Sequence, residues 1–399
     1  MALPVPPLVM ALGAVGRGVA RVRPFVGFVF EGGQHSGDVE GWVARAREEM
    51  AVLLARRLVD TGLLDKVVFV TDRPALAERA ASLAGVDTAV TPDESASSFH
   101  FGRRLAQVIA EYDAAGFIYM SGGSGLLMNM DELAGFVLAT QERPGCVVAN
   151  NVYSADMFGA ADSQAALPAE LPATDNGVPM TAHAAGIPVY GLPPTTGNTF
   201  DIDTPSDLVV LGDVIPILAP YAQCVRDVAA RGPVERAAPV LAAARAALAR
   251  DLAEIALIGR VSPATVADLN SRTTCRLRVY SEERGMRAFG RDKPGMARSL
   301  IGKMIESDGP GAFFANLAWC SDAAFIDTRV LFAHMGAALS QEERFCSDLF
   351  LWENVTSGDA SCLIQEALDA QIPVMLGGHS LVSGAVRALA ACTGRRGVV

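Results

Sequence analysis

Short apolar runs alternate with amphipathic stretches through the first half of the chain. Phe25–Phe30, Lys66–Thr71 and residues 117–120 have strand length, whereas residues 41–61 and 101–112 place apolar side chains three to four positions apart. This alternation predicts an α/β fold, with a mostly parallel twisted sheet and helices on both faces. Further strands are expected at residues 88–90, 146–150 and 187–192, and further helices at residues 74–83 and 129–140.

The periodicity is lost between residues 152 and 181, where alanine, proline and aspartate are frequent. A stretch of this length without a pattern predicts a surface excursion or an active-site flap. A clear helix start follows it, because Thr204 is placed as a cap, Pro205 as the first helical residue and Asp207 in the first turn.

A change of pattern near Gly232 and Pro233 predicts a domain boundary. Residues 1–23 are expected to form a tail or edge element, residues 24–232 a first domain, and residues 233–399 a smaller mixed α/β or mainly helical domain. In the latter, strands are expected at residues 255–258, 276–280 and 372–376, and a helix after Ser262, while residues 323–335 fit either a helix or a strand.

Composition narrows the class of protein. The chain has 399 residues, a net charge of −11 and no apolar run of transmembrane length, so neither nucleic acid nor a membrane is expected as a partner. A small anionic ligand in a local pocket remains compatible with this charge. The seven cysteines have no CxxC spacing, which predicts reduced thiols in a cytoplasmic protein. The alanine-rich second domain is compatible with a homodimer.

Three polar, glycine-rich turns follow predicted strands of the first domain, at residues 31–38, 121–125 and 197–203. In an open parallel sheet, ligands bind at the carboxyl ends of the strands, so these turns are expected to share one site. Backbone amides in such turns can face a phosphate. The alternative is a set of flexible connections. The candidate phosphate-binding residues are Gly32, Gly33, Ser121, Gly122, Gly123 and Ser124.

Two aspartates in the third turn are candidate metal ligands. In an extended segment, Asp201 and Asp203 point to the same side, and paired carboxylates suit Mg²⁺. The alternative is that Asp203 and Asp207 serve only the following helix N-terminus.

Residues 201–208, Asp-Ile-Asp-Thr-Pro-Ser-Asp-Leu, resemble the closing motif of the molybdenum-cofactor and phospholactate nucleotidyltransferases. By order of elements the resemblance covers about residues 24–215 and implies a sugar-nucleotide transferase fold. It implies transfer of a nucleoside monophosphate from an NTP to a small phosphorylated or hydroxyl acceptor, with Mg²⁺ assistance. Asp201 is then the expected metal ligand and catalytic residue, with Asp203 beside it.

The chain departs from that family at two places. The opening loop, residues 31–41, contains no Arg or Lys, and Gly123 stands where the family has its main metal-binding aspartate. Three functions therefore stay open: a divergent nucleotidyltransferase, a non-catalytic nucleotide or sugar-phosphate binding protein, and a glycosyltransferase that uses a sugar nucleotide.

Several basic groups could supply the missing positive charge. His100 and Arg103 open a helix near the same sheet edge, or else form an ordinary exposed helix start. In the second domain, five arginines between residues 276 and 291 predict either an anion site that faces the first domain or a salt-bridged surface. His379, in a glycine-rich turn after a predicted strand, is either a further anion ligand or a structural histidine.

Overall fold

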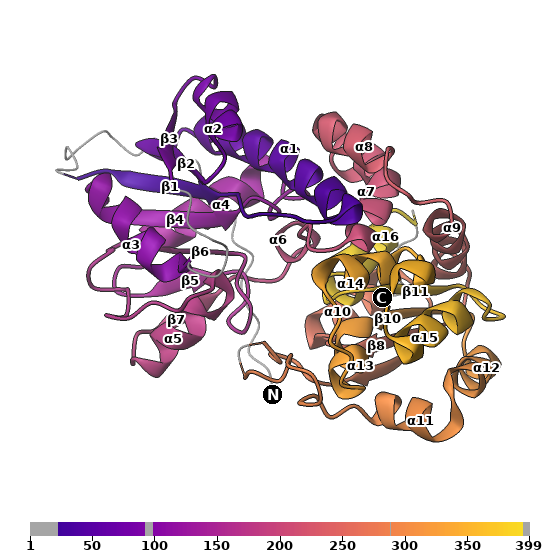
Figure 1. Ribbon diagram of the computed structural model, residues 1–399. Coiled ribbons are helices and arrows are strands. Elements are labelled where there is room, and N and C mark those ends of the chain that lie inside the picture. Colours follow the sequence, from indigo (N-terminus) through magenta and orange to yellow (C-terminus); the bar gives the residue numbers. More distant parts are fainter. Residues whose placement is uncertain (1–22, 92–98, 288, 394–399) are drawn as a thin grey trace, which may run out of the picture.

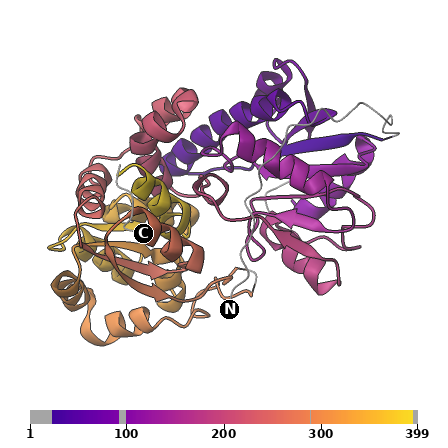
Figure 2. The same cartoon turned by 180° about the vertical axis from the view of Figure 1, so that it is seen from behind.

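The computed structural model describes residues 23–91, 99–287 and 289–393 (Figure 1). Two β-sheets lie side by side, each covered by helices, and the view from behind shows the same division (Figure 2). Residues 1–22, expected to form most of a tail, lie outside the described part. Within that part, the structure has no helix with the length and apolar character needed to cross a membrane.

The first sheet has seven strands in the order β3-β2-β1-β4-β6-β5-β7. β6 runs antiparallel to β4 and β5, and the other pairs are parallel, so the predicted mostly parallel sheet is confirmed. Its strands are β1 (Phe25–Phe30), β2 (Lys66–Thr71), β3 (Val86–Val90), β4 (Gly116–Ser121), β5 (Val147–Ala149), β6 (Met157–Ala160) and β7 (Val189–Gly191).

Residues 152–181, expected to form a surface excursion or an active-site flap, contain regular structure. Residues 175–177 form a 3-10 helix, another helix begins at Val178, and Met157–Ala160 form β6, a strand that the sequence did not predict. The strand sequence, Met-Phe-Gly-Ala, is buried throughout and contains no β-branched residue. It therefore shows neither the alternation nor the composition by which a strand is recognised from sequence.

Helices cover both faces of the first sheet, as predicted. Phe25 and Val29 of β1 pack in the same cluster as Met50 of α1, whereas Val26 and Phe28 pack with Leu105 of α3. Successive strand residues point to opposite faces, so a strand that is apolar throughout is buried on both sides. The helices are α1 (Asp38–Asp60), α2 (Pro74–Ala81), α3 (Phe101–Glu111), α4 (Met130–Gln141), η1 (Asp175–Gly177), α5 (Val178–Ala184) and α6 (Thr196–Thr199).

The second sheet has four parallel strands in the order β11-β10-β8-β9. The chain passes through β8 (Glu254–Gly259), β9 (Arg276–Ser281), β10 (Ala323–Asp327) and β11 (Val374–Gly377). Residues 323–335 are both strand and helix, because α13 begins directly after β10. The helices are α9 (Ala237–Leu248), α10 (Pro263–Arg272), α11 (Leu300–Asp308), α12 (Pro310–Cys320), α13 (Thr328–His334), α14 (Gln341–Asp348), η3 (Trp352–Asn354), α15 (Gly358–Leu368), η4 (Leu381–Ala385) and α16 (Val386–Ala391).

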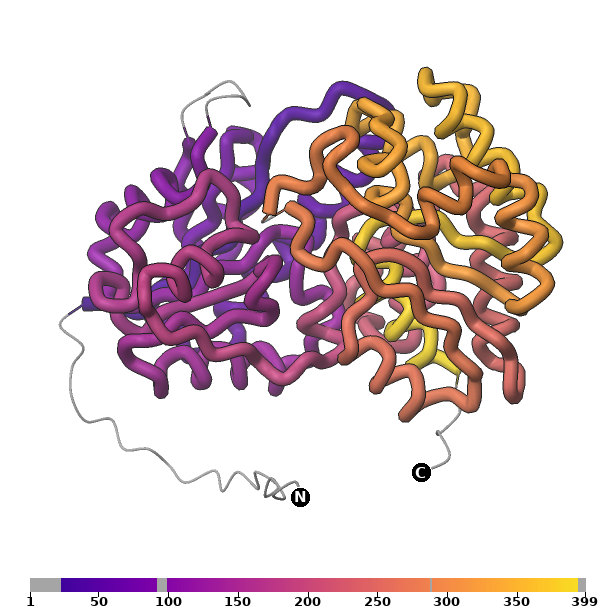
Figure 3. Tube along the Cα trace, turned by 90° about the horizontal axis from the view of Figure 1, so that it is seen from below, coloured from indigo at the N-terminus to yellow at the C-terminus, as the bar shows by residue number. Residues whose placement is uncertain are grey.

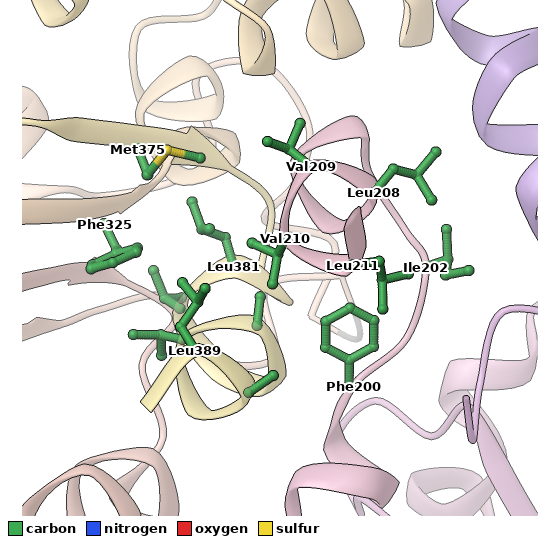
Figure 4. Close-up of a cluster of buried hydrophobic side chains, with 14 of the residues drawn as sticks. Phe200, Ile202, Leu208, Val209, Val210, Leu211, Phe325, Met375, Leu381 and Leu389 are labelled. Carbon is green, nitrogen blue, oxygen red and sulfur yellow. The ribbon is translucent and has the colours of Figure 1, made fainter. Parts of the chain in front are cut away.

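Three elements join the two halves: α7 (Pro205–Leu218), η2 (Pro220–Ala222) and α8 (Gln223–Ala229). α7 contacts α1 on one side and α9, β11 and α16 on the other. Its residue Leu211 and the preceding Phe200 lie near Leu381 and Leu389 in one buried cluster (Figure 4). Since α7 packs on both halves, the boundary at residue 232 stays a prediction.

The helix start at Thr204 forms as predicted. The Asp207 carboxylate accepts hydrogen bonds from the backbone N–H of Thr204 (2.7 Å) and from its hydroxyl (2.9 Å). The same carboxylate accepts a hydrogen bond from Ser380, in the turn after β11. The motif at residues 201–208 is therefore held in place from the second half of the molecule.

Candidate functional site

Each sheet has a point where the strand order reverses. In the first sheet β2 and β4 lie on opposite sides of β1, and in the second β9 and β10 lie on opposite sides of β8. Crevices at the carboxyl ends of such strands are the usual ligand sites of open α/β sheets. One cleft of about 960 Å³ is lined by Glu31 and Ser121 from the first reversal point and by Arg260 from the second. The two reversal points thus open into the same space.

Arg47 of α1 lies at the centre of the first reversal point. Its guanidinium donates to the Ile202 carbonyl (2.7 Å) and to Ser121 Oγ (3.3 Å), and it pairs with Glu31 (3.1 Å). Burial lowers the pKa of Arg47, but the negative charges of Glu31 and Asp203 outweigh burial and raise it. The residue is therefore a fixed positive charge that joins the ends of β1 and β4 to the aspartate motif. No sequence signal marked Arg47, because it lies in the third turn of a long helix and not in a glycine-rich turn after a strand.

Arg47 also leaves little room for a side chain at residue 123. A Cβ atom on Gly123 would lie 2.6 Å from Arg47 Nη1 and 2.9 Å from the Ile202 carbonyl oxygen. Any side chain at residue 123 would have to displace the guanidinium or the backbone of the aspartate motif. Gly123 and Arg47 thus form one packed unit.

Three carboxyl groups gather beside Arg47. Burial, followed by the charges of Asp203 and Asp156, raises the pKa of Asp201 well above its ordinary value. Burial and the charges of Asp203 and Asp175 raise the pKa of Asp156 in the same way. Asp201 is only 8% exposed, whereas the Asp203 side chain is 53% exposed. The structure therefore brings the two predicted aspartates together and adds Asp156, which precedes the unrecognised strand β6.

This carboxyl cluster is not arranged as a finished metal site. Among residues 23–91, 99–287 and 289–393, no group of three or more His, Cys, Asp or Glu side chains is positioned to hold a metal ion. Burial is the main cause of the raised pKa values, and the repulsion between neighbouring carboxylates adds to it. A cation beside the cluster would relieve that repulsion.

The opening glycine loop is held by carboxylates. The Gly33 N–H donates to both oxygens of the Asp72 carboxylate (3.1 Å each), and the Ser36 N–H donates to Glu40 (2.9 Å). Arg73 contacts the Gly33 carbonyl and pairs with Glu48, so a guanidinium reaches this loop although its own sequence has none. A phosphate at Gly33 would have to displace Asp72, and the phosphate-binding role of Gly32 and Gly33 stays a prediction.

The turn at residues 121–125 packs tightly against its neighbours. Ser121 lines the cleft, while Ser124 is buried and forms a β-bridge with Asp201. A Cβ atom on Gly122 would lie 2.8 Å from the Cβ of Glu31. The turn therefore positions the aspartate motif, and phosphate binding by its amides also stays a prediction.

His100 and Arg103 do not join these residues. The His100 ring caps α3 by accepting a hydrogen bond from the Arg103 N–H (3.3 Å), and Arg103 is exposed. Neither residue lines the cleft that contains Asp203 and Arg47. The structure thus gives His100 the local role that was the alternative at the sequence level.

The arginines of residues 276–291 divide into two groups. Arg276 and Arg278 pair with Glu254 (3.1 and 3.3 Å), and Arg291 pairs with Glu283, so these three form the salt-bridged surface. Arg284 and Arg287 instead line the hollows that adjoin Asp156 and Asp203. The salt-bridged surface is therefore confirmed for the first three arginines, and an anion site at Arg284 and Arg287 stays a prediction.

The second domain also supplies a cap to the first. The Glu342 carboxylate of α14 accepts hydrogen bonds from the N–H groups of Val39 (3.0 Å) and Glu40 (2.8 Å) in the first turn of α1. The local N-cap, Gly37, offers no side chain, and a Cβ atom there would collide with the Glu342 carboxylate. Glu342 thus occupies the positive end of the α1 dipole and links the domains.

We expect Glu342→Ala to lower the free energy of unfolding by about 1 kcal/mol, as loss of a helix cap does. Gly37→Ala should have a similar effect, because its backbone φ of −116° suits alanine but its methyl group would expel Glu342. In urea unfolding, the double variant should lose less than the sum of the two single losses. Strictly additive losses would show that the two residues do not act on the same cap.

Comparisons with known proteins give distant likenesses. No protein-family model and no curated protein matches the chain. Among solved structures, a cytidylyltransferase from Leptospira borgpetersenii is 16% identical with a TM-score of 0.37, over 52% of this chain and 97% of that chain. A CMP:2-keto-3-deoxy-manno-octonic acid synthetase complexed with CTP is 13% identical with a TM-score of 0.34, over 50% and 99%. The Rv0371c protein of Mycobacterium tuberculosis, in complex with manganese, is 19% identical with a TM-score of 0.29, over 46% and 95%. At these values no residue role passes from those proteins to this chain.

Proposed function

We propose that this protein is a nucleotidyltransferase that binds an NTP in the cleft and transfers its nucleoside monophosphate to a small acceptor. The observation that carries the proposal is the convergence of Asp156, Asp201 and Asp203 with Arg47 at the reversal point of the first sheet. Fixed charges of both signs around one crevice suit a polyphosphate, whose charge must be neutralised while one of its bonds is broken. The resemblance at residues 201–208 supports the same reaction.

The carboxylates present fit a divalent cation by their chemistry. Asp201 and Asp203 offer hard oxygen donors, and their repulsion with Asp156 is the kind of charge excess that Mg²⁺ relieves. We infer that Asp201 and Asp203 would hold the ion, which when bound neutralises phosphate charge and polarises a phosphoryl oxygen. Gly123 contributes no ligand, in contrast to the family's aspartate.

The residues of the chain then act by positioning and by charge. Arg47, fixed by Glu31 and the Ile202 carbonyl, offers a guanidinium to the phosphates without needing to move. An acceptor oxygen attacks the α-phosphorus and forms a new P–O bond. The bond from the α-phosphorus to the oxygen that bridges it to the β-phosphate breaks, and pyrophosphate leaves with that oxygen. A phosphate acceptor reacts as an anion, so no proton has to be removed from it.

A non-catalytic nucleotide-binding protein is the second candidate. It is favoured by Gly123, because Arg47 fills the place of the family's carboxylate and leaves fewer ligands for a metal ion. The two candidates differ in one respect: a binder would take up the nucleotide without releasing pyrophosphate.

The experiment is a thermal-unfolding panel of the four common NTPs and of sugar nucleotides, each with and without Mg²⁺. A ligand that binds only the native state raises its unfolding temperature by mass action. We expect one NTP to do so in a Mg²⁺-dependent manner. Binding that ignores Mg²⁺, without pyrophosphate release, would identify the non-catalytic binder. A preference for a sugar nucleotide would favour a glycosyltransferase, and a panel without any shift would exclude all three.

A further inference from the structure

The reversal point of the second sheet is built as a site of its own. Arg260 follows β8 and forms a two-pronged ion pair with Asp327 at the end of β10, with contacts of 2.5 and 3.1 Å. The two strands approach so closely here that a Cβ atom on Gly259 would meet the Asp327 side chain, and Gly259 has a φ of +115°. Arg260 is therefore neutralised and fixed at the floor of the cleft.

Three further arginines line the same cleft around that pair: Arg287, Arg329 and Arg344. Arg329 is neutralised by the fully buried Asp348, with contacts of 2.7 and 2.6 Å. Within the described part of the chain, Arg287 and Arg344 form no ion pair with a carboxylate. Arg344 donates to the Leu339 carbonyl (2.9 Å), and Arg287 to the Asn176 side chain (3.1 Å).

The surplus positive charge is evident from its effect within the cluster. Burial, followed by the charges of Arg329 and Arg287, lowers the pKa of Arg344. Like charges kept close together in a partly buried cleft are unfavourable unless an anion lies between them. The second domain thus lines a ligand-sized cleft with two guanidinium groups that form no ion pair with a described residue, the exposed Arg287 and the half-buried Arg344.

This cluster adjoins the carboxylates of the first domain. Arg287 donates to the Asn176 side-chain oxygen, and the Asn176 amide donates in turn to Asp156 Oδ1 (3.2 Å). Arg287 and the opening loop of the first domain line the same cleft, and the view from below shows the two halves of the molecule side by side (Figure 3). A ligand held by the arginines would therefore lie next to the carboxyl cluster.

We propose that Arg287 and Arg344 form an anion-binding site in the second domain, and that this site takes the phosphate group of a second ligand in the cleft. Two unpaired guanidinium groups match the charge of nearly −2 that a phosphate monoester carries at pH 7, and a carboxylate would neutralise only one. The planar guanidinium can also bind two phosphate oxygens at once. The role of this ligand as the acceptor of the nucleotidyl group rests on the proposed function.

The test is titration of the full-length protein with inorganic phosphate, followed by calorimetry, with acetate as the carboxylate probe. We expect phosphate to bind and acetate to bind at least tenfold more weakly. Arg287→Gln, at an exposed residue, should weaken phosphate binding about tenfold or more. Arg276→Gln removes an equally charged arginine of the same domain, which pairs with Glu254 and does not line the cleft, and it should leave the affinity unchanged.

Three results would overturn the assignment. These are no phosphate binding, equal binding of acetate, or equal losses in Arg287→Gln and Arg276→Gln, which would indicate a general charge effect. Arg344→Gln is the second variant, and a loss there with intact thermal unfolding adds support. The nucleotide panel is independent of this titration. If phosphate binding depends on Arg287 but no NTP binds, the anion site stands and the nucleotidyltransferase proposal fails.

Discussion

Asp201→Asn is expected to reduce nucleotidyl transfer by about 10³-fold and to abolish the Mg²⁺-dependent part of NTP binding. The substitution keeps the size of the side chain but removes the carboxylate that we assign to the metal ion. Lewis-acid stabilisation of a phosphoryl transition state is worth several kcal/mol, and each 1.4 kcal/mol is a factor of about ten in rate. Pyrophosphate release with the NTP identified by the thermal panel measures the effect.

The same variant separates a chemical role from a structural one. Asp201 is buried beside Asp203 and Asp156, so a neutral amide removes repulsion, and thermal unfolding without ligand should not fall. Asp131→Asn is the matched control, because Asp131 is an exposed carboxylate in the first turn of α4. Full activity in Asp201→Asn would refute the assignment, and equal losses in both variants would show an unspecific charge effect.

Gly384→Ala is expected to lower the free energy of unfolding by about 3 kcal/mol, at the upper end of the cost of overpacking. A Cβ atom on this residue of η4 would lie 2.5 Å from the Phe200 Cα and would also collide with the Thr199 carbonyl oxygen. The collision is with backbone atoms, which cannot rotate away as a side chain can. The substitution therefore pushes the second domain away from the segment that leads into Asp201.

In Gly384→Ala, both the free energy of unfolding measured in urea and the affinity for the NTP should fall, because the displaced segment carries the aspartate motif. Gly135→Ala in α4 is the control, since nothing lies within 4 Å of a Cβ atom there and Ala favours a helix. The control should be neutral or stabilising by about 0.5 kcal/mol. A stability of Gly384→Ala equal to that of the control would show that the contact between η4 and residues 199–200 is not tight.

The sequence by itself determined the helices and strands that are marked by residues close together in the chain, such as apolar runs and helix caps. Apolar runs of strand length placed β1, β2 and β8, and the order Thr204, Pro205, Asp207 placed the start of α7. Caps and periodicities of this kind depend on neighbours within one turn or one strand, so they can be read without knowledge of the fold. The sequence also predicted that the side chains of Asp201 and Asp203 lie close together, because the two residues are two positions apart in an extended segment.

Tertiary structure decided what completes the site. Arg47 comes from within α1, Asp156 from a loop before an unpatterned strand, and Arg287 and Arg344 from the second domain. The sequence marked Arg287 only as one of five clustered arginines, and Arg47, Asp156 and Arg344 have no local motif. Each of the four joins the site only because residues that are far apart in the chain come together. The sequence showed that residue 123 is a glycine, where the family that residues 201–208 resemble has an aspartate. Only the packed structure shows that a Cβ atom there would lie 2.6 Å from Arg47 Nη1.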